Sequence, residues 1–342
     1  IDPRWMEPGL VPADYPSLRL ALDKFVLAHP QHLYAQLATQ LDDFSESLIA
    51  EAKDFFSFYN IPVVSDDNHL VAAISPIGKL KPTAFASHSQ GLPNHILENA
   101  SALYVHIPGL THYPQEMIGQ NLKAHFKQVK VVTYEVKHNA TSAFASVLSF
   151  FEDSQAVAAL SAFIKSHLTT EQVVVLPPVL GVENAEKNHQ SLLGELKVKV
   201  IEQLSALPSS TGMRLQKNMQ KKLNEVAEVV SGKVTGFTTD TGIQSLKVDM
   251  RGEENEVVAK NYLLATGKYL GGGLKHQQHF SESVFDLPVF NGADAVSKDR
   301  PMTHLLDPVA SNSQPFMALG LKVDATGHPV CTNQKQVYTN LA

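Results

Sequence analysis

A chain of 342 residues that is 44% hydrophobic and 18% charged has the composition of a globular protein rather than a disordered one. Its 28 Lys and Arg against 34 Asp and Glu give a net charge of −6, which excludes the basic excess expected of a nucleic-acid-binding protein. No apolar run approaches the ~18–20 residues of a membrane helix. The single cysteine, Cys331, excludes an internal disulfide framework and fits a reducing compartment.

The first hundred residues combine a helical pattern with short β-forming runs. Apolar residues from Leu33 to Phe55 recur at spacings of three and four, which predicts one amphipathic helix ending near Pro62. The segment from Pro62 to Ser87 holds short apolar runs and a turn at 76–78. We expect a β-rich pair of strands there.

Residues 101–204 alternate between strand and helix patterns. Buried-strand runs lie at 102–107, 129–136 and 172–176, and helical patterns lie around 117–126, 143–151 and 157–167. Strands that alternate with helices of about ten residues indicate a mainly parallel sheet with helices on its faces. The sequence therefore predicts an α/β fold, with residues 101–204 as an α/β region.

The last third begins with a helix and continues into strands. Apolar residues from Leu215 to Val230 form one helix face, and Ser209, Ser210 or Thr211 is expected to cap the N-terminus of that helix. Strands are then expected at 233–240 and 243–250, which flank a hairpin turn at 241–242, and at 257–264, 318–324 and 338–342.

Small residues after the strand at 257–264 are candidates for a cofactor site. They let the backbone approach a ligand, which at the carboxyl end of a sheet strand is commonly a nucleotide cofactor. The candidate cofactor-binding residues are Ala265, Thr266, Gly267, Gly271, Gly272 and Gly273. The alternative is a tight glycine-rich turn without a ligand.

A second candidate site lies at the start of the helix after residue 208. Ser209, Ser210, Gly212 and Arg214 are placed to contact the phosphate of a cofactor or a substrate, helped by the helix dipole. The alternative is a capped helix whose first-turn arginine is solvated or pairs with a carboxylate.

Histidines provide no clear metal site or catalytic base. His276 and His279 lie three residues apart without a third ligand, which favours an exposed loop over a metal site. His106 and His112 flank a Pro-Gly pair, and no histidine is assigned as the base. Catalytic residues are thus unassigned, and no metal is expected.

Several segments, taken in order and spacing, carry a resemblance to a known family: 29–30, 74–83, 106–110, 176–181, 207–216 and 265–274. The chain resembles the B subunit of anaerobic glycerol-3-phosphate dehydrogenase along most of its length. The resemblance implies a two-dinucleotide-type (Rossmann-like) flavin-binding domain formed by residues 1–100 and 205–342, around the inserted region 101–204.

The same resemblance implies a function, cofactor and partners. The function is oxidation of sn-glycerol 3-phosphate to dihydroxyacetone phosphate, with electrons passed toward quinone. The cofactor is FMN, with FAD as the alternative. The implied partners are a flavin-bearing A subunit and an iron–sulfur C subunit that anchors the complex to the membrane. A lone cysteine cannot ligate an iron–sulfur cluster, which takes about four cysteines, so the cluster would belong to a partner. Because the C subunit anchors the complex, we expect a cytoplasmic protein that is peripheral to the inner membrane through this partner.

Two parts of the family pattern are absent from this sequence. They are the N-terminal Gly-x-Gly-x-x-Gly turn and a C-terminal glycine-rich loop. We therefore expect a piece of a longer protein, with both termini missing. Two alternative functions remain open on the sequence alone: another flavoprotein oxidoreductase, of the fumarate-reductase type, and a non-catalytic docking scaffold.

Overall fold

The computed structural model divides the chain into two compact units, Ile1–Glu228 (unit 1) and Val229–Ala342 (unit 2). The structure describes residues 17–30, 32–66, 69–92, 99–136, 144–206, 208–269, 271–276, 280–292, 294–297, 300–309, 314–333 and 335–342. His279 and two residues of the segments that carry the resemblance, Leu207 and Leu270, lie outside the described residues.

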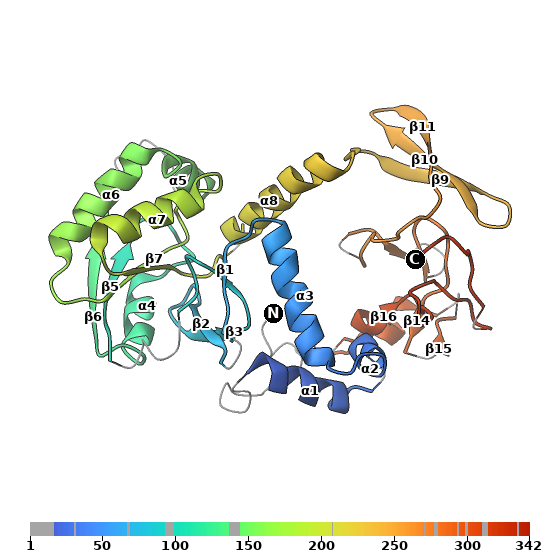
Figure 1. The fold of residues 1–342 in the computed structure, drawn as a ribbon, viewed down its shortest axis with the longest axis horizontal. Coiled ribbons are helices and arrows are strands. Elements are labelled where there is room, and N and C mark those ends of the chain that lie inside the picture. The colour runs from blue at the N-terminus through green and yellow to red at the C-terminus, as the bar shows by residue number, and fades with distance from the viewer. Residues whose placement is uncertain are drawn as a thin grey trace. The chain divides into compact units, whose positions relative to one another are not determined.

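A four-stranded parallel sheet lies in unit 1 (Figure 1). Its strand order is β6-β5-β7-β8, from β5 (Ser101–His106), β6 (Gln128–Thr133), β7 (Val173–Leu176) and β8 (Lys199–Glu202). The intervening helices are α4 (Gln115–Leu122), α5 (Phe144–Phe150), α6 (Ser154–His167) and α7 (Ala185–Leu196). The predicted α/β class and parallel sheet are confirmed.

Both faces of this sheet are covered. Residues 102–105 of β5 and all of β7 are 0% exposed, although successive side chains of a strand point to opposite faces. Side chains of α4, α6 and α7 join the strands in one hydrophobic cluster, and α6 and α7 pack side by side (Figure 1). Such complete burial requires helices on both faces, as the sequence predicted.

Short helices and small antiparallel sheets precede the parallel sheet. They are α1 (Leu18–Ala28), α2 (Leu33–Ala38) and α3 (Phe44–Phe58), then β1 (Val63–Val64) paired with β4 (Ala86–Ser87), and β2 (Val71–Ile74) paired with β3 (Leu80–Thr83). The predicted β-rich pair and its turn at 76–78 are confirmed. The prediction of one continuous helix from residue 33 is wrong, because the carboxylate of Asp43 accepts the N–H of Glu46 and starts a second helix.

Helix α8 (Ser210–Val226) closes the described part of unit 1. The hydroxyl of Ser209 accepts the N–H of Gly212 at 3.0 Å, so Ser209 is the N-cap among the three residues predicted. The helix ends at Val226, and Val230 lies beyond it.

Unit 2 consists of small sheets. β9 (Lys233–Thr239), β10 (Ile243–Met250) and β11 (Glu253–Val258) form an antiparallel meander, which confirms the predicted hairpin at 241–242. The shorter elements are β12 (Leu274–His276), β13 (Phe280–Glu282), β14 (Phe290–Asn291), β15 (Asp294–Ala295), β16 (Leu319–Gly320), and the 3₁₀ helices η4 (Met302–Leu305) and η5 (Pro315–Ala318).

The predicted strand at 257–264 is wrong in its extent. Strand β11 ends at Val258, and the next pairing is an isolated parallel bridge between Tyr262 and Leu341. The predicted strand at 318–324 shortens to β16, and the one at 338–342 is reduced to this bridge. The two-dinucleotide-type domain over 1–100 and 205–342 stays a prediction.

Among the described residues, no single helix is long and apolar enough to cross a membrane. Helices α5 and α6 reach that length and hydrophobicity only as a pair, which is bent by 94° between them.

Candidate functional site

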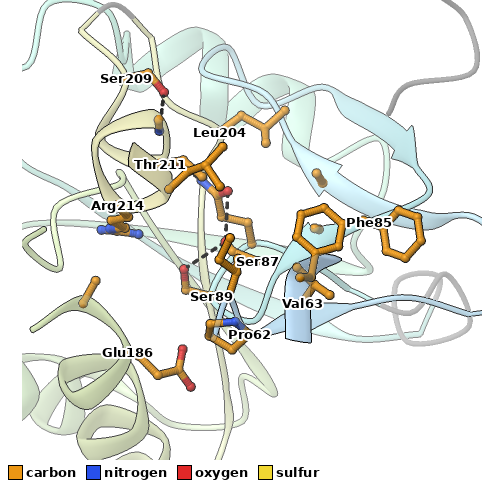
Figure 2. Close-up of a pocket in the computed structure, with 18 of the residues that line it drawn as sticks. Pro62, Val63, Phe85, Ser87, Ser89, Glu186, Leu204, Ser209, Thr211 and Arg214 are labelled. Carbon is orange, nitrogen blue, oxygen red and sulfur yellow. Dashed lines mark hydrogen bonds between the residues drawn. The ribbon is translucent and has the colours of Figure 1, made fainter. Parts of the chain in front are cut away.

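A pocket of about 570 Å³ lies in unit 1 near the carboxyl ends of β7 and β8 (Figure 2). Its walls come from the end of α3 and β1, from β3 and β4, from the loop after β7, and from the first turns of α8. Small-molecule sites commonly span ~300–1,000 Å³. Parallel α/β sheets bind their ligands beyond the carboxyl ends of the strands, so both size and position fit a ligand site.

Segments that lie far apart in the sequence meet beside this pocket. The N–H of Leu204 donates to the carbonyl oxygen of Ile74 at 2.6 Å, and the N–H of Gln203 donates to that of Leu176 at 2.7 Å. The side chain of Arg214 donates to the carbonyl oxygen of Gly181 at 2.8 Å. Three of the segments that carry the family resemblance, 74–83, 176–181 and 207–216, therefore converge at one place.

Arg214 forms a buried ion pair with Glu202. Its two terminal nitrogens donate to the two carboxylate oxygens at 2.6 and 3.0 Å, and the side chains are 12% and 0% exposed. Ser89 and the N–H of Leu180 also donate to this carboxylate, at 2.7 and 2.8 Å. The structure thus shows the carboxylate pairing that the sequence left as an alternative for Arg214, and a phosphate contact there stays a prediction.

The ion pair shifts both pKa values. Burial alone would raise the pKa of Glu202, but the charge of Arg214 and the hydrogen bonds from Arg214, Leu180 and Ser89 outweigh it, so that pKa lies below its ordinary value. Burial alone would lower the pKa of Arg214, but the facing charge of Glu202 raises it. Both groups are therefore charged at neutral pH, and their charges cancel beside the pocket.

A polar wall of hydroxyl and amide groups follows the ion pair. The side-chain amide of Gln90 donates to the carbonyl oxygen of Gln203 and to the hydroxyl of Thr211, both at 2.9 Å. Ser87 donates to the amide oxygen of Gln90 at 3.1 Å. With Ser209 at the helix cap, these groups form an uncharged polar part of the lining, which also includes the charged residues Lys81, Glu183 and Glu186. Among the predicted residues, Ser209, Gly212 and Arg214 line the pocket, and Ser210 lies buried behind it.

The opposite wall is apolar. Phe85 and Phe56 lie with their ring centroids 5.2 Å apart, and Pro62 and Val63 continue the same surface. Figure 2 shows Phe85, Val63 and Pro62 on one side of the pocket, and Ser209, Thr211 and Arg214 on the other.

An internal carboxylate fills the anion position at the start of α7. The side chain of Glu152 accepts the N–H groups of Val182, Glu183 and Asn184, the last two at 2.8 and 3.0 Å. A helix N-terminus at the end of a parallel strand is a common phosphate position. Glu152 occupies it here, so this turn offers no further anion site.

The glycine segment of unit 2 closes on itself. The N–H of Gly273 donates to the carbonyl oxygen of Lys268 at 2.8 Å, and a Cβ on Gly273 would overlap the backbone of Gly267. A Cβ on Gly271 would come within 2.7 Å of the Thr266 carbonyl oxygen. The loop's own backbone fills the spaces beside Gly271 and Gly273, whereas the space beside Gly272 is open.

The candidate cofactor residues differ in exposure. Ala265, Gly267, Gly271 and Gly272 are exposed, Thr266 is half-buried and Gly273 is buried. Gly267 and Gly272 have φ angles of +77°, which a tight turn requires. Flavin binding by this segment stays a prediction.

His106 and His112 do not line the pocket of unit 1. His106 is half-buried, its Nδ1 has no hydrogen-bond partner among the described residues, and burial lowers its pKa. His112 and His276 are exposed. The described residues contain no group of three metal-ligating side chains.

Sequence analysis missed Glu202, Ser89, Gln90 and Phe85. One signal for Glu202 was present, because an acidic residue directly after two apolar residues at the end of a buried strand requires a partner. The other three lie in a short β-rich segment. Their partners, Glu202, Thr211 and Phe56, lie far away in the sequence, so no local pattern marks these contacts.

Comparison with curated proteins extends the family resemblance over most of the chain. The chain is 24% identical over 330 residues to the B subunit of anaerobic glycerol-3-phosphate dehydrogenase from Vibrio vulnificus strain CMCP6, covering 90% of this chain and 72% of that protein. It is 23% identical over 326 residues to the protein of the same name from Actinobacillus succinogenes, covering 86% and 71%. No family model and no solved structure matches the chain.

Proposed function

We propose that this chain is a flavin-dependent subunit of a quinone-linked glycerol-3-phosphate dehydrogenase. The names of its relatives support an oxidoreductase-type role within a multi-subunit enzyme. The proposed reaction is oxidation of sn-glycerol 3-phosphate to dihydroxyacetone phosphate, with electrons passed toward quinone. The proposed partners are a flavin-bearing A subunit and an iron–sulfur C subunit, through which the chain is peripheral to the inner membrane on the cytoplasmic side.

The convergence of separate segments at the pocket is the observation that carries this proposal. The segments 74–83 and 207–216 both line one pocket, and 176–181 contacts Arg214 beside it. Three of the six segments that carry the resemblance therefore meet where an α/β fold commonly binds a small molecule.

FMN is the proposed cofactor, with FAD as the alternative. A bound flavin would supply hydride or electron acceptance, which this chain's own side chains do not provide. No contact is derived from the glycine segment, because the loop's own backbone fills the spaces beside Gly271 and Gly273. The pocket in unit 1 is the better candidate, because it combines polar groups and the cation Lys81 with aromatic side chains. Its residues would exclude water from a bound ring and hold its polar edge.

Reconstitution with FMN tests the proposal. The full chain is incubated with FMN or FAD, freed of excess cofactor, and examined by visible absorption, alone and co-expressed with A-type and C-type subunits. We expect flavin bands in the chain and their bleaching by glycerol 3-phosphate in the complex.

The rival functions give different results in the same experiment. A colourless chain after reconstitution supports the docking scaffold. A flavin that glycerol 3-phosphate leaves oxidised, but that fumarate reoxidises after chemical reduction, supports a fumarate-reductase type of enzyme.

A further inference from the structure

Six lysines gather at the amino-terminal edge of the parallel sheet in unit 1. Each connection of a parallel sheet returns to the same edge, so the ends of α4, α6 and α7 lie there with the starts of β6, β7 and β8. The register agrees, because Ala102 of β5 pairs with Val173 of β7, which pairs with Lys199 of β8. The lysines of this edge are Lys123, Lys127, Lys130, Lys165, Lys197 and Lys199.

Few negative charges oppose this lysine edge. The described helix ends and connections that carry it contain two carboxylates, Glu171 and Glu195. Glu171 accepts the N–H groups of Thr169 and Thr170 at 2.7 and 3.1 Å, so its own loop already satisfies part of its charge. No lysine of the edge forms an ion pair with a carboxylate in the described part of the chain, and all but Lys130 are exposed. The edge therefore presents uncompensated positive charge to solvent.

Three of these lysines surround a hollow of about 550 Å³. Lys123, Lys127 and Lys130 line it from the connection before β6, and Thr169 and Thr170 line it from the connection before β7. Ammonium groups that share one hollow repel one another, and an anionic group placed among them would relieve that repulsion.

Helix stability explains only part of this arrangement. Lys165 lies in the last turn of α6, and Lys123 and Lys197 are the C-caps of α4 and α7, where a positive charge favours the helix. Lys127 and Lys199 lie beyond these helices. They add charge to the edge without stabilising a helix terminus.

The composition of the edge fits a lipid surface better than a protein partner. Protein interfaces are enriched in aromatic residues, Met and Arg, and depleted in Lys. The connections that form this edge hold no arginine, and none of the exposed large apolar side chains in the described part of the chain lies in them. A layer of anionic headgroups requires no apolar anchor, because it attracts each ammonium as a point charge.

We propose that the lysine edge of unit 1 docks directly on a membrane surface that contains anionic phospholipids. The pocket lies near the carboxyl ends of β7 and β8, at the opposite end of the same strands, so docking keeps the pocket away from the lipid. This proposal goes beyond the proposed function, in which a partner subunit holds the chain at the membrane. It depends on charge and requires neither flavin nor glycerol 3-phosphate.

Co-sedimentation of the full chain with vesicles tests the proposal. One kind of vesicle is phosphatidylcholine alone, and the other contains phosphatidylcholine and phosphatidylglycerol in equal parts. The edge variant combines Lys123→Gln, Lys127→Gln and Lys199→Gln. The matched control combines Lys221→Gln, Lys233→Gln and Lys260→Gln, which are exposed lysines outside the edge, so both variants lose the same charge.

We expect wild type and the control to bind the phosphatidylglycerol vesicles at low salt and to leave them at high salt, which screens the attraction. Each lysine near an anionic membrane adds about fivefold to the affinity, so the edge variant should bind at least about tenfold more weakly. Absence of wild-type binding, equal binding to both kinds of vesicle, or equal losses in the edge and control variants would overturn the proposal.

An acidic protein surface is the alternative partner, and co-expression with A-type and C-type subunits distinguishes it. If the chain binds neither kind of vesicle and the edge variant alone fails to co-purify with these subunits, the edge docks on a protein and the membrane proposal is wrong. Failure of the proposed function gives a different result. A chain that binds phosphatidylglycerol through this edge but holds no flavin contradicts the flavin-dependent role and leaves the docking intact.

Discussion

At the scale of single residues, the Arg214–Glu202 pair holds α8 to the end of β8. Four hydrogen-bond donors from separate parts of unit 1 reach this carboxylate, namely both terminal nitrogens of Arg214, the Ser89 hydroxyl and the Leu180 N–H. Arg214→Ala leaves Glu202 buried and without a cation. We expect a loss of about 3–5 kcal/mol in the free energy of unfolding, measured by urea denaturation.

The matched control is the double variant Arg214→Met with Glu202→Leu. It removes both charges and keeps apolar volume, so we expect it to be more stable than Arg214→Ala alone. Arg214→Ala within about 1 kcal/mol of wild type would contradict a buried pair. It would favour the phosphate contact that sequence analysis considered.

Tyr113 gives the same region a pH dependence. Its hydroxyl donates to the carbonyl oxygen of Leu204 and accepts the N–H of Ala206 at 2.8 Å. Burial is the main cause that raises its pKa, from 10.0 to about 12, and the charge of Glu202 adds to it. Below pH 10 the hydroxyl is protonated in both the folded and the unfolded state, and its contribution to stability is complete. Above pH 10 the unfolded state loses its proton first.

We therefore expect the free energy of unfolding to fall between pH 10 and about 12. Tyr113→Phe removes the titrating group, so its urea midpoint should fall less steeply over this window, although it starts lower at pH 8. The slope does not vanish, because burial also raises the pKa of Tyr104. An identical slope in wild type and Tyr113→Phe would refute this assignment.

At the scale of elements, Glu152 determines how α7 begins. The N-cap residue of α7 is Asn184, whose side chain makes no hydrogen bond to the helix. Glu152, which lies between α5 and α6, accepts the N–H groups of Glu183 and Asn184 instead. Glu152→Gln removes the charge that favours a helix N-terminus. We expect a loss of about 1 kcal/mol in the free energy of unfolding.

The control for this prediction is Glu195→Gln in the last turn of α7. It makes the same chemical change on an exposed side chain at the end of the helix where a negative charge is unfavourable. Its free energy of unfolding should equal or exceed that of wild type. Equal losses of unfolding free energy in Glu152→Gln and Glu195→Gln would mean that the effect does not depend on which end of α7 carries the charge. That result would contradict a stabilising interaction of Glu152 with the N-terminus of α7.

Some elements could be predicted from the sequence because residues next to one another in the chain determine them. β5 and β7 are continuous apolar runs, and the α8 cap and the hairpin turn carry their own residue types. The break between α2 and α3 was missed because the apolar spacing continues across it. The end of β11 was missed because the next residue to pair, Tyr262, finds its partner in Leu341, far along the chain. Neither break changes the local hydrophobic pattern.

The pocket was predictable only in part for the same reason. A helix cap with an adjacent arginine identified Ser209 and Arg214, but the partner of Arg214 lies on a strand that no motif marks. Gln90 meets Thr211 only through tertiary packing. Sequence patterns thus identified Ser209 and Arg214. The structure was needed to show that the charge of Arg214 is neutralised by Glu202.

At the scale of the whole molecule, the two units have separate hydrophobic clusters. In unit 1 the main cluster surrounds the parallel sheet, and a smaller one joins α1 to α3. The clusters of unit 2 form around Leu274 and Leu319, and around Tyr262 and Phe285. Units with their own cores commonly unfold as separate cooperative transitions. We therefore expect two transitions in a calorimetric scan of the full chain.

Variants confined to one unit assign these transitions. Glu202→Gln weakens the ion pair in unit 1, and Gly273→Ala forces a Cβ against the backbone of Gly267 in unit 2. Each should lower the midpoint of one transition and leave the other within about 1 °C, because a change in stability shifts only the cooperative unit that contains it. If both variants lower one common transition, the units unfold together. FMN, which we propose as the cofactor in the pocket of unit 1, should raise the midpoint of the transition that Glu202→Gln lowers, because a ligand stabilises the state that binds it.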